Sequence, residues 1–186
     1  RLSDGAFLAL YEETSDGNYV ISGLVFLMDG TTTFSIAEKI VFGRDFAIGN
    51  DALLSAVRTP AHGCGVTTPR QALFFYLRND TSLQWEYQQT LTPPATASNE
   101  DFGVSIVMNP EGTQAIVGSP HLPSGSSPGV GGHVYFYERS WADPKVWTVT
   151  QALSDPLASV HAAGAFGYFL SVDKEFLVLA VSSNQN

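Results

Sequence analysis

Apolar residues occur along this chain in short runs that are separated by turn-forming residues. The best-defined set is Phe102–Met108, Gln114–Gly118, His133–Glu138 and Trp147–Ala152. Short runs rich in aromatic and β-branched residues, bounded by Gly, Pro, Asn and Asp, predict β-strands. No stretch of the sequence has the 3.6-residue apolar period of a long amphipathic helix. We therefore expect an all-β chain in which these four segments form one four-stranded antiparallel sheet.

The same order of runs recurs, and each recurrence opens with a Phe-Gly dipeptide. The dipeptides are Phe42-Gly43, Phe102-Gly103 and Phe166-Gly167, at spacings of 60 and 64 residues. A fixed period of this size predicts an array of one structural unit. We divide the chain into a divergent partial unit at 1–41, complete units at 42–101 and 102–165, and the start of another unit at 166–186.

The second half of the unit also repeats. An aromatic residue is followed six residues later by an aliphatic one, at Phe34 and Ile40, at Trp85 and Leu91, and at Trp147 and Leu153. Because six is an even offset, both side chains are predicted to point to one face of a strand. A looser match aligns Gly23–Met28 with the third strand of the later units.

Together these motifs resemble the FG-GAP repeats that form the propeller of the integrin α-subunit. The best-matched unit carries Phe102-Gly103, Gly118-Ser119-Pro120, Gly132-His133-Val134-Tyr135, Trp147 and Gln151-Ala152-Leu153. The unit before it departs from the pattern, since Arg58-Thr59-Pro60 stands where the family has Gly-Ala-Pro. The resemblance implies a β-propeller, whose four-stranded antiparallel blades are arranged around an axis. It implies about three repeats here, with incomplete blades at both ends of the chain.

Many FG-GAP blades bind calcium in an Asp-x-Asp-x-Asp-Gly loop between their first two strands. A hard cation of this kind needs several closely spaced oxygen ligands. At that position the chain has Gly49–Asp51, Asn109–Gly112 and Asp173–Glu175, and none supplies three acidic or amide side chains at alternating positions. We therefore expect no cofactor and no bound metal, although calcium is the ion that the resemblance would suggest. Asp16-Gly17-Asn18 and Asp29-Gly30 are predicted to be hairpin turns.

Composition narrows the classes of partner. The formal net charge is −9, with 9 basic and 18 acidic residues and no basic stripe. Nucleic-acid binding depends on clustered Lys and Arg, so we expect no nucleic acid partner. The longest apolar run, Phe176–Val181, has the length of a strand and falls far short of the roughly 20 residues of a membrane span. We expect no membrane insertion within these residues.

Weak signals favour an exported protein. Asn79-Asp80-Thr81 is an N-glycosylation sequon in a predicted turn, so Asn79 is the candidate glycosylation site. Cys64 is the only cysteine and excludes a disulfide within these residues. His62 and Cys64 share a Gly-rich loop, but two ligands fall short of a zinc site. We expect an extracellular or cell-surface location.

The sequence contains no catalytic motif. The other three His residues are His121, His133 and His161, and they lie in predicted loops or in a strand. There is no Gly-x-Ser-x-Gly turn, no His-Glu-x-x-His and no phosphate-binding glycine loop. We expect that the protein is not an enzyme. The long loops Ala61–Gln71 and His121–Gly132 occupy equivalent places in successive units and are the candidate contacts for a protein or glycan partner.

Two further functions stay open. The chain could be a structural subunit of a surface filament or coat, in which exposed blade edges pair with other copies of itself. A propeller-scaffold hydrolase would need acidic or His residues that converge at the axis. The incomplete units at both ends lead us to expect either that the chain is part of a longer polypeptide or that another chain completes its sheets.

Overall fold

The described part of the chain consists of β-strands. The computed structural model describes residues 7–26, 41–58, 71–94, 101–120, 131–156 and 165–183, and these hold twelve strands and no helix. The strands are β1 (Phe7–Glu13), β2 (Tyr19–Phe26), β3 (Val41–Ile48), β4 (Ala52–Arg58), β5 (Gln71–Arg78), β6 (Trp85–Leu91), β7 (Ser105–Met108), β8 (Gln114–Ser119), β9 (His133–Arg139), β10 (Trp147–Ser154), β11 (Leu170–Val172) and β12 (Leu179–Val181). None of the described elements is a helix that could cross a membrane. The prediction of an all-β chain is confirmed for these ranges.

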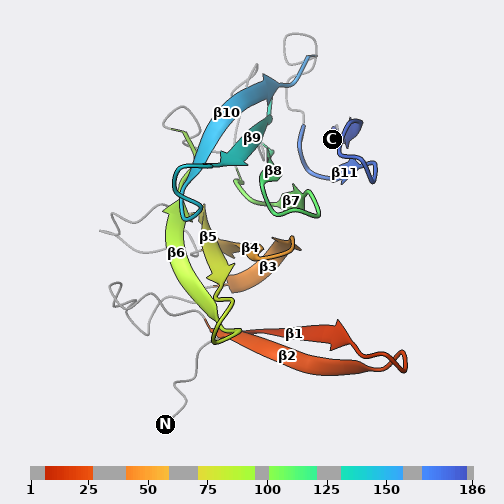
Figure 1. Cartoon of the computed structure of the whole chain (residues 1–186). Helices are drawn as coiled ribbons and strands as arrows, with labels where there is room; N and C mark the ends of the chain where they lie inside the picture. Colours follow the sequence, from red (N-terminus) through yellow and green to blue (C-terminus); the bar gives the residue numbers. More distant parts are fainter. Residues whose placement is uncertain are drawn as a thin grey trace.

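The described residues form two complete four-stranded sheets and two two-stranded half sheets (Figure 1). The complete sheets run in the order β3-β4-β5-β6 and β7-β8-β9-β10, and the half sheets are the hairpins β1-β2 and β11-β12. Every pair of neighbouring strands is antiparallel. The prediction of one four-stranded antiparallel sheet in each complete unit is therefore confirmed. The turn predicted around Gly17 joins β1 to β2, whereas Asp29-Gly30 lies outside the described residues.

The first strand of the second complete sheet is shorter than the apolar run predicts. β7 begins at Ser105, and Phe102-Gly103 forms a turn before it. Gly103 has a φ of +81°, a conformation that glycine adopts without steric cost. Its amide donates to the carbonyl oxygen of Gly118 at 2.9 Å. Phe102 is thereby turned into the core, and its ring packs edge-on against Tyr135 with centroids 5.9 Å apart.

The sheets pack face to face, and their cores lie between them. One buried cluster fills the space between the complete sheets: Ala52, Leu54, Ala56, Leu73, Phe75, Leu91, Phe102, Ile106, Ala115, Val117, Tyr135, Tyr137 and Trp147. A second cluster forms on the other face of β7-β10, where Ile116 and Val134 pack toward Phe166 and the β11-β12 hairpin. Alternate residues of β8 and β9 therefore enter opposite cores, as the two-residue period of a strand requires. Burial on both faces explains why these strands read as continuous apolar runs.

The first strands of successive sheets lie side by side. β3 is next to β7, and β7 is next to β11. The Asp45 carboxylate accepts a hydrogen bond from the Ile106 amide at 2.6 Å, and the Ser105 hydroxyl accepts one from the Leu170 amide at 3.1 Å. Asp45 and Ser105 each stand three residues after the Phe of their own Phe-Gly motif. The same side-chain-to-backbone link is thus repeated along the stack.

A β-bulge interrupts the fourth strand of each complete sheet. Thr150 in β10 and Gln88 in β6 are extra residues that have no opposite residue in the ladder. A bulge shifts the alternation of the side chains that follow it. Trp147 accordingly lies in the core between the complete sheets, whereas Leu153 packs on the other face of its sheet, toward β11-β12. The prediction that the aromatic and aliphatic residues share a face is wrong for this strand.

The leading hairpin carries the same bulge. Ser22 is the extra residue of β2, and like Gln88 and Thr150 it is the fourth residue of its strand. The β1-β2 hairpin therefore corresponds to the third and fourth strands of a unit. The alignment of Gly23–Met28 with a third strand is wrong, because Tyr19–Phe26 has the register of a fourth strand. The repeat predicted at Phe34–Ile40 lies outside the described residues.

Candidate interaction site at the loop end of the sheets

The two candidate binding loops leave the sheets at equivalent corners. Arg58, the last residue of β4, stands opposite Gln71, the first residue of β5. Ser119 at the end of β8 stands opposite His133 at the start of β9 in the same way. Most of both predicted loops lies outside the described residues, at 59–70 and 121–130. Their anchor points are described, and we call this edge of the stack the loop end.

A buried polar contact fixes the loop end between the two complete sheets. The side-chain amide of Gln71 donates to the Asp101 carboxylate, and its carbonyl accepts from the Phe102 amide. Asp101 is 3% exposed, and its own amide donates to the carbonyl of Pro120 at 2.8 Å. The start of the second complete unit is thus bonded to the loop anchors of both sheets. These bonds hold the two loop anchors at a fixed separation.

The glycines of the repeat motif are explained at the same end. The Phe166-Gly167 turn passes directly over the preceding sheet, so a Cβ at Gly118 would lie 2.0 Å from the Gly167 carbonyl oxygen. A Cβ at Gly132 would lie 2.1 Å from the Phe166 carbonyl oxygen. Both distances are far below van der Waals contact, so only glycine fits at either position. The Phe166-Gly167 turn therefore packs on Gly118 and Gly132 of the unit before it.

The ionisable side chains described at the loop end include His133 and Asp155. The His133 ring stacks on Tyr135, with centroids 5.8 Å apart, and is half-buried. Asp155 is buried, and its amide donates to the Gly132 carbonyl at 3.3 Å. Across the ranges that the structure describes, no three His, Cys, Asp or Glu side chains are grouped closely enough to hold a metal ion. The other residues considered for such roles lie outside those ranges: His62, Cys64, His121 and His161.

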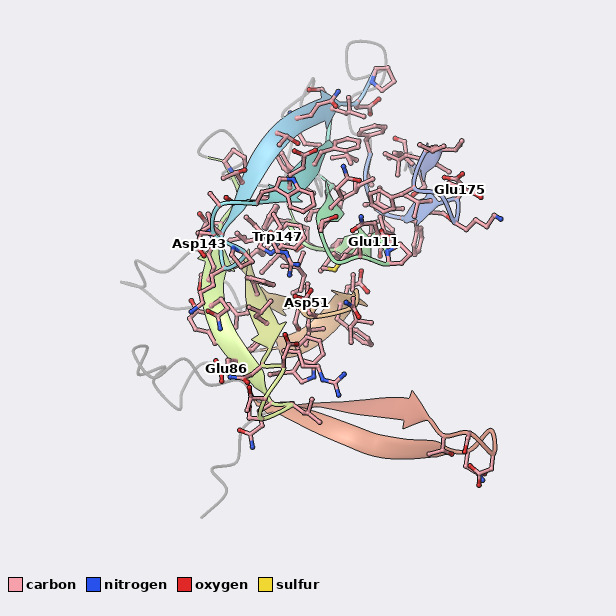
Figure 2. The ribbon with its side chains drawn as sticks, in the orientation of Figure 1. Asp51, Glu86, Glu111, Asp143, Trp147 and Glu175 are labelled. Carbon is pink, nitrogen blue, oxygen red and sulfur yellow. The ribbon has the colours of Figure 1, made fainter. Side chains whose placement is uncertain are left out.

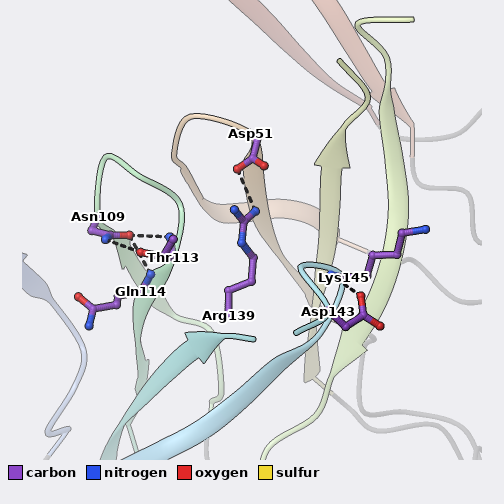
Figure 3. Close-up of polar contacts among 7 residues, drawn as sticks. All are labelled: Asp51, Asn109, Thr113, Gln114, Arg139, Asp143 and Lys145. Atoms are coloured by element: carbon purple, nitrogen blue, oxygen red, sulfur yellow. Dashed lines mark hydrogen bonds and ion pairs between the residues drawn. The ribbon is translucent and has the colours of Figure 1, made fainter. Parts of the chain in front are cut away.

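At the opposite end of the sheets, the turn that resembles a calcium loop uses its side-chain oxygen internally (Figure 3). Asn109 Oδ1 accepts from the amides of Thr113 and Gln114, both at 2.8 Å. Asp173 repeats the arrangement, accepting from the amides of Leu177 and Val178 at 2.7 and 2.8 Å. The hydrogen bond from Val178 is the main cause that holds the pKa of Asp173 below its ordinary value of 3.8. These oxygens stabilise the turn itself.

Two contacts between the complete sheets have no counterpart in the sequence predictions. Arg139 Nη1 bonds Asp51 Oδ1 at 2.8 Å, and joins the end of β9 to the β3-β4 turn (Figure 3). The Gln89 amide group bonds the backbone of Trp147 twice, accepting from its N–H at 2.8 Å and donating to its carbonyl at 3.3 Å. Gln89 and Gln151 each follow a Trp by four residues, and that spacing is the signal that could have revealed the contact.

Asn79, the candidate glycosylation site, lies in the turn between β5 and β6, away from the loop end. Its Oδ1 accepts from the amides of Thr81 and Ser82 at 2.9 and 3.0 Å. Its Nδ2, the atom that a glycan would modify, donates to Glu86 Oε1 at 2.9 Å; Glu86 is labelled in Figure 2. The modification itself stays a prediction.

Comparison with known proteins adds no identification. The sequence matches no known family and no curated protein.

Proposed function

We propose that this chain is a non-enzymatic interaction module of the FG-GAP propeller type, located outside the cell or on its surface, whose loop end contacts a protein or glycan. The observation that carries the proposal is the equivalent placement of the loop anchors, Arg58 with Gln71 and Ser119 with His133, on successive sheets. Loops that leave a rigid scaffold at one edge present a continuous surface to a partner.

The arrangement of the sheets supports the propeller part of the proposal. Successive sheets share buried cores between their faces, and their first strands lie side by side while the fourth strands β6 and β10 lie away from β3 and β7 (Figure 1). In a propeller the first strands of the blades surround the axis and the fourth strands form the rim. Repeated links such as Asp45 to Ile106 and Ser105 to Leu170 would then form a ring around that axis.

Binding and location form the second part of the proposal. The partner would meet a surface of Gly, Pro, Ser, Thr and His residues, which suits polar contacts with a protein or a glycan. A glycan at Asn79 would lie at the turn end, where it would not cover the loop end. We infer an adhesion or recognition role outside the cell or on its surface.

Loop exchange tests the proposal. One variant replaces residues 61–69 with a Gly-Ser linker of equal length, and a second does the same for 122–130. A control carries Lys174→Ser in the turn between β11 and β12, at the end of the sheets opposite the loop end. The variants and the native protein are screened on a glycan array and against cell-surface proteins displayed on beads. We expect the native protein to bind a partner, both loop variants to lose at least tenfold in affinity, and the control to keep it. Absence of any partner, or binding that survives both exchanges, would overturn the proposal.

A second candidate function, a structural subunit that assembles through strand pairing, is favoured by one observation. The chain carries two half sheets of different type, β1-β2 and β11-β12. An unpaired strand edge can pair with a strand of another chain.

A further inference from the structure

The residue that corresponds to Gln71 in the second complete unit is a glycine. Arg78 and Arg139 each stand opposite the Trp that begins the fourth strand of their sheet, so they mark the same position in the two units. Seven residues before them lie Gln71 and Gly132. Because Gly132 has no side chain, the hydrogen bonds that Gln71 makes cannot be repeated in the second unit.

The partner of Gln71 is not repeated either. Asp101 and Ala165 correspond, because each directly precedes the Phe of a Phe-Gly motif. They are 3% and 9% exposed, so both positions are buried, but an alanine side chain can neither donate nor accept a hydrogen bond. We call Gln71 and Asp101 the polar pair. Both of its members are replaced, by Gly and Ala, at the next junction between sheets.

The two junctions are packed in different ways. At the second, the backbone of the Phe166-Gly167 turn lies so close to Gly132 that a Cβ there would be 2.1 Å from the Phe166 carbonyl oxygen. At the first, a Cβ on Gly103 would meet side chains instead, 2.7 Å from Leu73 Cδ2 and 3.3 Å from Ala56 Cβ. The second junction is made without a polar pair at these positions. The repeated fold therefore does not itself require one.

The polar pair lies between the anchors of the two loops. The Gln71 side chain donates to the Asp101 carboxylate and accepts from the Phe102 amide, so both ends of its amide group are used and its orientation is fixed. The Asp101 amide donates to the carbonyl of Pro120 at 2.8 Å. Gln71 begins β5, directly after one loop, and Pro120 directly precedes the other. One continuous set of hydrogen bonds thus joins the two loop anchors.

We propose that Gln71 and Asp101 are positioning residues for partner binding, which fix the two loops relative to each other so that one partner molecule contacts both at once. This inference rests on the proposed function of the loop end. Asp101 is too deeply buried to touch a partner and acts through the loop anchors. Two contacts held at a fixed separation bind one partner more tightly than two independent contacts, because less conformational freedom is lost on binding.

Exchange of the two side-chain types tests the pair. Gln71→Glu removes the donor and places two carboxylates against each other, and Gln71→Ala removes the bonds without adding charge. The double variant Gln71→Glu with Asp101→Asn restores one amide donor and one carboxylate acceptor in reversed places. The control is Gln114→Glu, which makes the same change beside Glu138 at the other end of the sheets, where Gln114 Nε2 donates to Glu138 Oε1 at 3.4 Å.

Spin-label distances test the positioning without any partner. Labels are attached to Thr59→Cys and His121→Cys, the residues that follow Arg58 and Pro120, with Cys64→Ser in every variant. Pulsed electron paramagnetic resonance should give one narrow distance distribution for the native pair and for the double variant. The distribution should be at least twofold wider for Gln71→Glu and for Gln71→Ala. Equal widths in all four proteins would refute the proposal.

Affinity for the partner found in the loop-exchange screen tests the consequence. We expect Gln71→Glu and Gln71→Ala to lose at least tenfold, the double variant to return to within threefold of the native protein, and Gln114→Glu to be unchanged. A merely structural role would lower the urea midpoint of Gln71→Ala but leave the affinity of the folded protein unchanged, and that result would refute the positioning role while the loop function stands. Absence of any partner would instead overturn the loop function, and the spin-label distances would still decide whether the polar pair fixes the loop anchors.

Discussion

Glycine at two positions decides how closely successive sheets can approach. Gly118 and Gly132 leave room for the backbone of Phe166-Gly167, which crosses the sheet where any Cβ would collide with it. Gln89 adds a polar bond at the opposite, fourth-strand side of the stack. Contacts between sheets in this chain thus depend on a few residues at the points where the sheets approach each other most closely. Substitution of any one of these residues should lower the free energy of unfolding.

Replacement of Gly118 by Ala should destabilise the protein. The added methyl group would lie 2.0 Å from a backbone carbonyl oxygen that a side-chain rotation cannot move. Overpacking of this kind costs about 1–3 kcal/mol. Urea denaturation should show that loss for Gly118→Ala and almost none for Ser171→Ala on the exposed face of β11. An unchanged denaturation midpoint for Gly118→Ala would show that the Phe-Gly turn does not pack on this glycine.

Replacement of Gln89 by Ala should also lower stability. It removes two hydrogen bonds and leaves the partly covered Trp147 backbone groups without that partner. A loss of about 1–3 kcal/mol is expected. The matched control is Gln88→Ala, because the Gln88 amide donates within its own strand. Equal effects of the two substitutions in urea denaturation would argue against a bond between the sheets.

Tyr137 should make stability sensitive to alkaline pH. Its hydroxyl is buried with no hydrogen-bond partner in the described structure, and burial is the main cause that raises its pKa above the ordinary value of 10.0. The Tyr137 hydroxyl therefore loses its proton at a lower pH in the unfolded chain than in the folded one. Below pH 10.0 its proton is bound in both states and the free energy of unfolding is unaffected, whereas above pH 10.0 the free energy of unfolding falls as the pH rises.

The variant Tyr137→Phe should gain about 1 kcal/mol in the free energy of unfolding at pH 7, because it no longer buries an unpaired hydroxyl. Its advantage over the native protein should grow between pH 10 and pH 11. Tyr87→Phe is the control and should lower stability at pH 7, since the Tyr87 hydroxyl bonds Thr90 at 2.7 Å. An advantage of Tyr137→Phe that stays constant with pH would refute the account.

At the element scale, the positions of the strands in the sequence were largely predictable. The face of the sheet to which each side chain points was not. The apolar runs identified β8, β9 and β10 within two residues of their observed bounds, because those strands are bounded by clear turn residues. The bulges at Gln88 and Thr150 escaped prediction, since neither position carries a Gly or another local signal. One extra residue in a strand moves every later side chain of that strand to the opposite face from the one predicted.

The turn between β7 and β8 is stabilised by one side-chain oxygen, Oδ1 of Asn109. Asn109→Ala should lower the free energy of unfolding by about 1–3 kcal/mol, because the amides of Thr113 and Gln114 lose their acceptor. Asn109→Asp is the conservative control and should keep most of the stability, since Asp173 fills the same role in the next unit. Thermal unfolding of both variants checks this, and an equal loss in both would contradict the assigned role.

At the scale of the whole molecule, the repeat predicted one four-stranded antiparallel sheet for each complete unit, and the structure has these two sheets. The candidate site was predicted only in outline. The positions of the loop anchors follow from the repeat. The hydrogen bond between Gln71 and Asp101 could not be predicted, because these residues are 30 positions apart and meet only when the sheets stack. Bonds between Gln89 and Trp147, 58 positions apart, likewise depend on how sheets stack. The spacing of Gln89 and Gln151 from a Trp marks a repeated position, but it does not show which residue of the next unit that position contacts.

A crystal structure of the protein tests the central claim, that the sheets are blades around one axis. The account predicts that the sheets surround one axis, with the first strands β3, β7 and β11 innermost and the fourth strands β6 and β10 at the rim. An open stack, or a ring in which the fourth strands β6 and β10 face the axis, would contradict it.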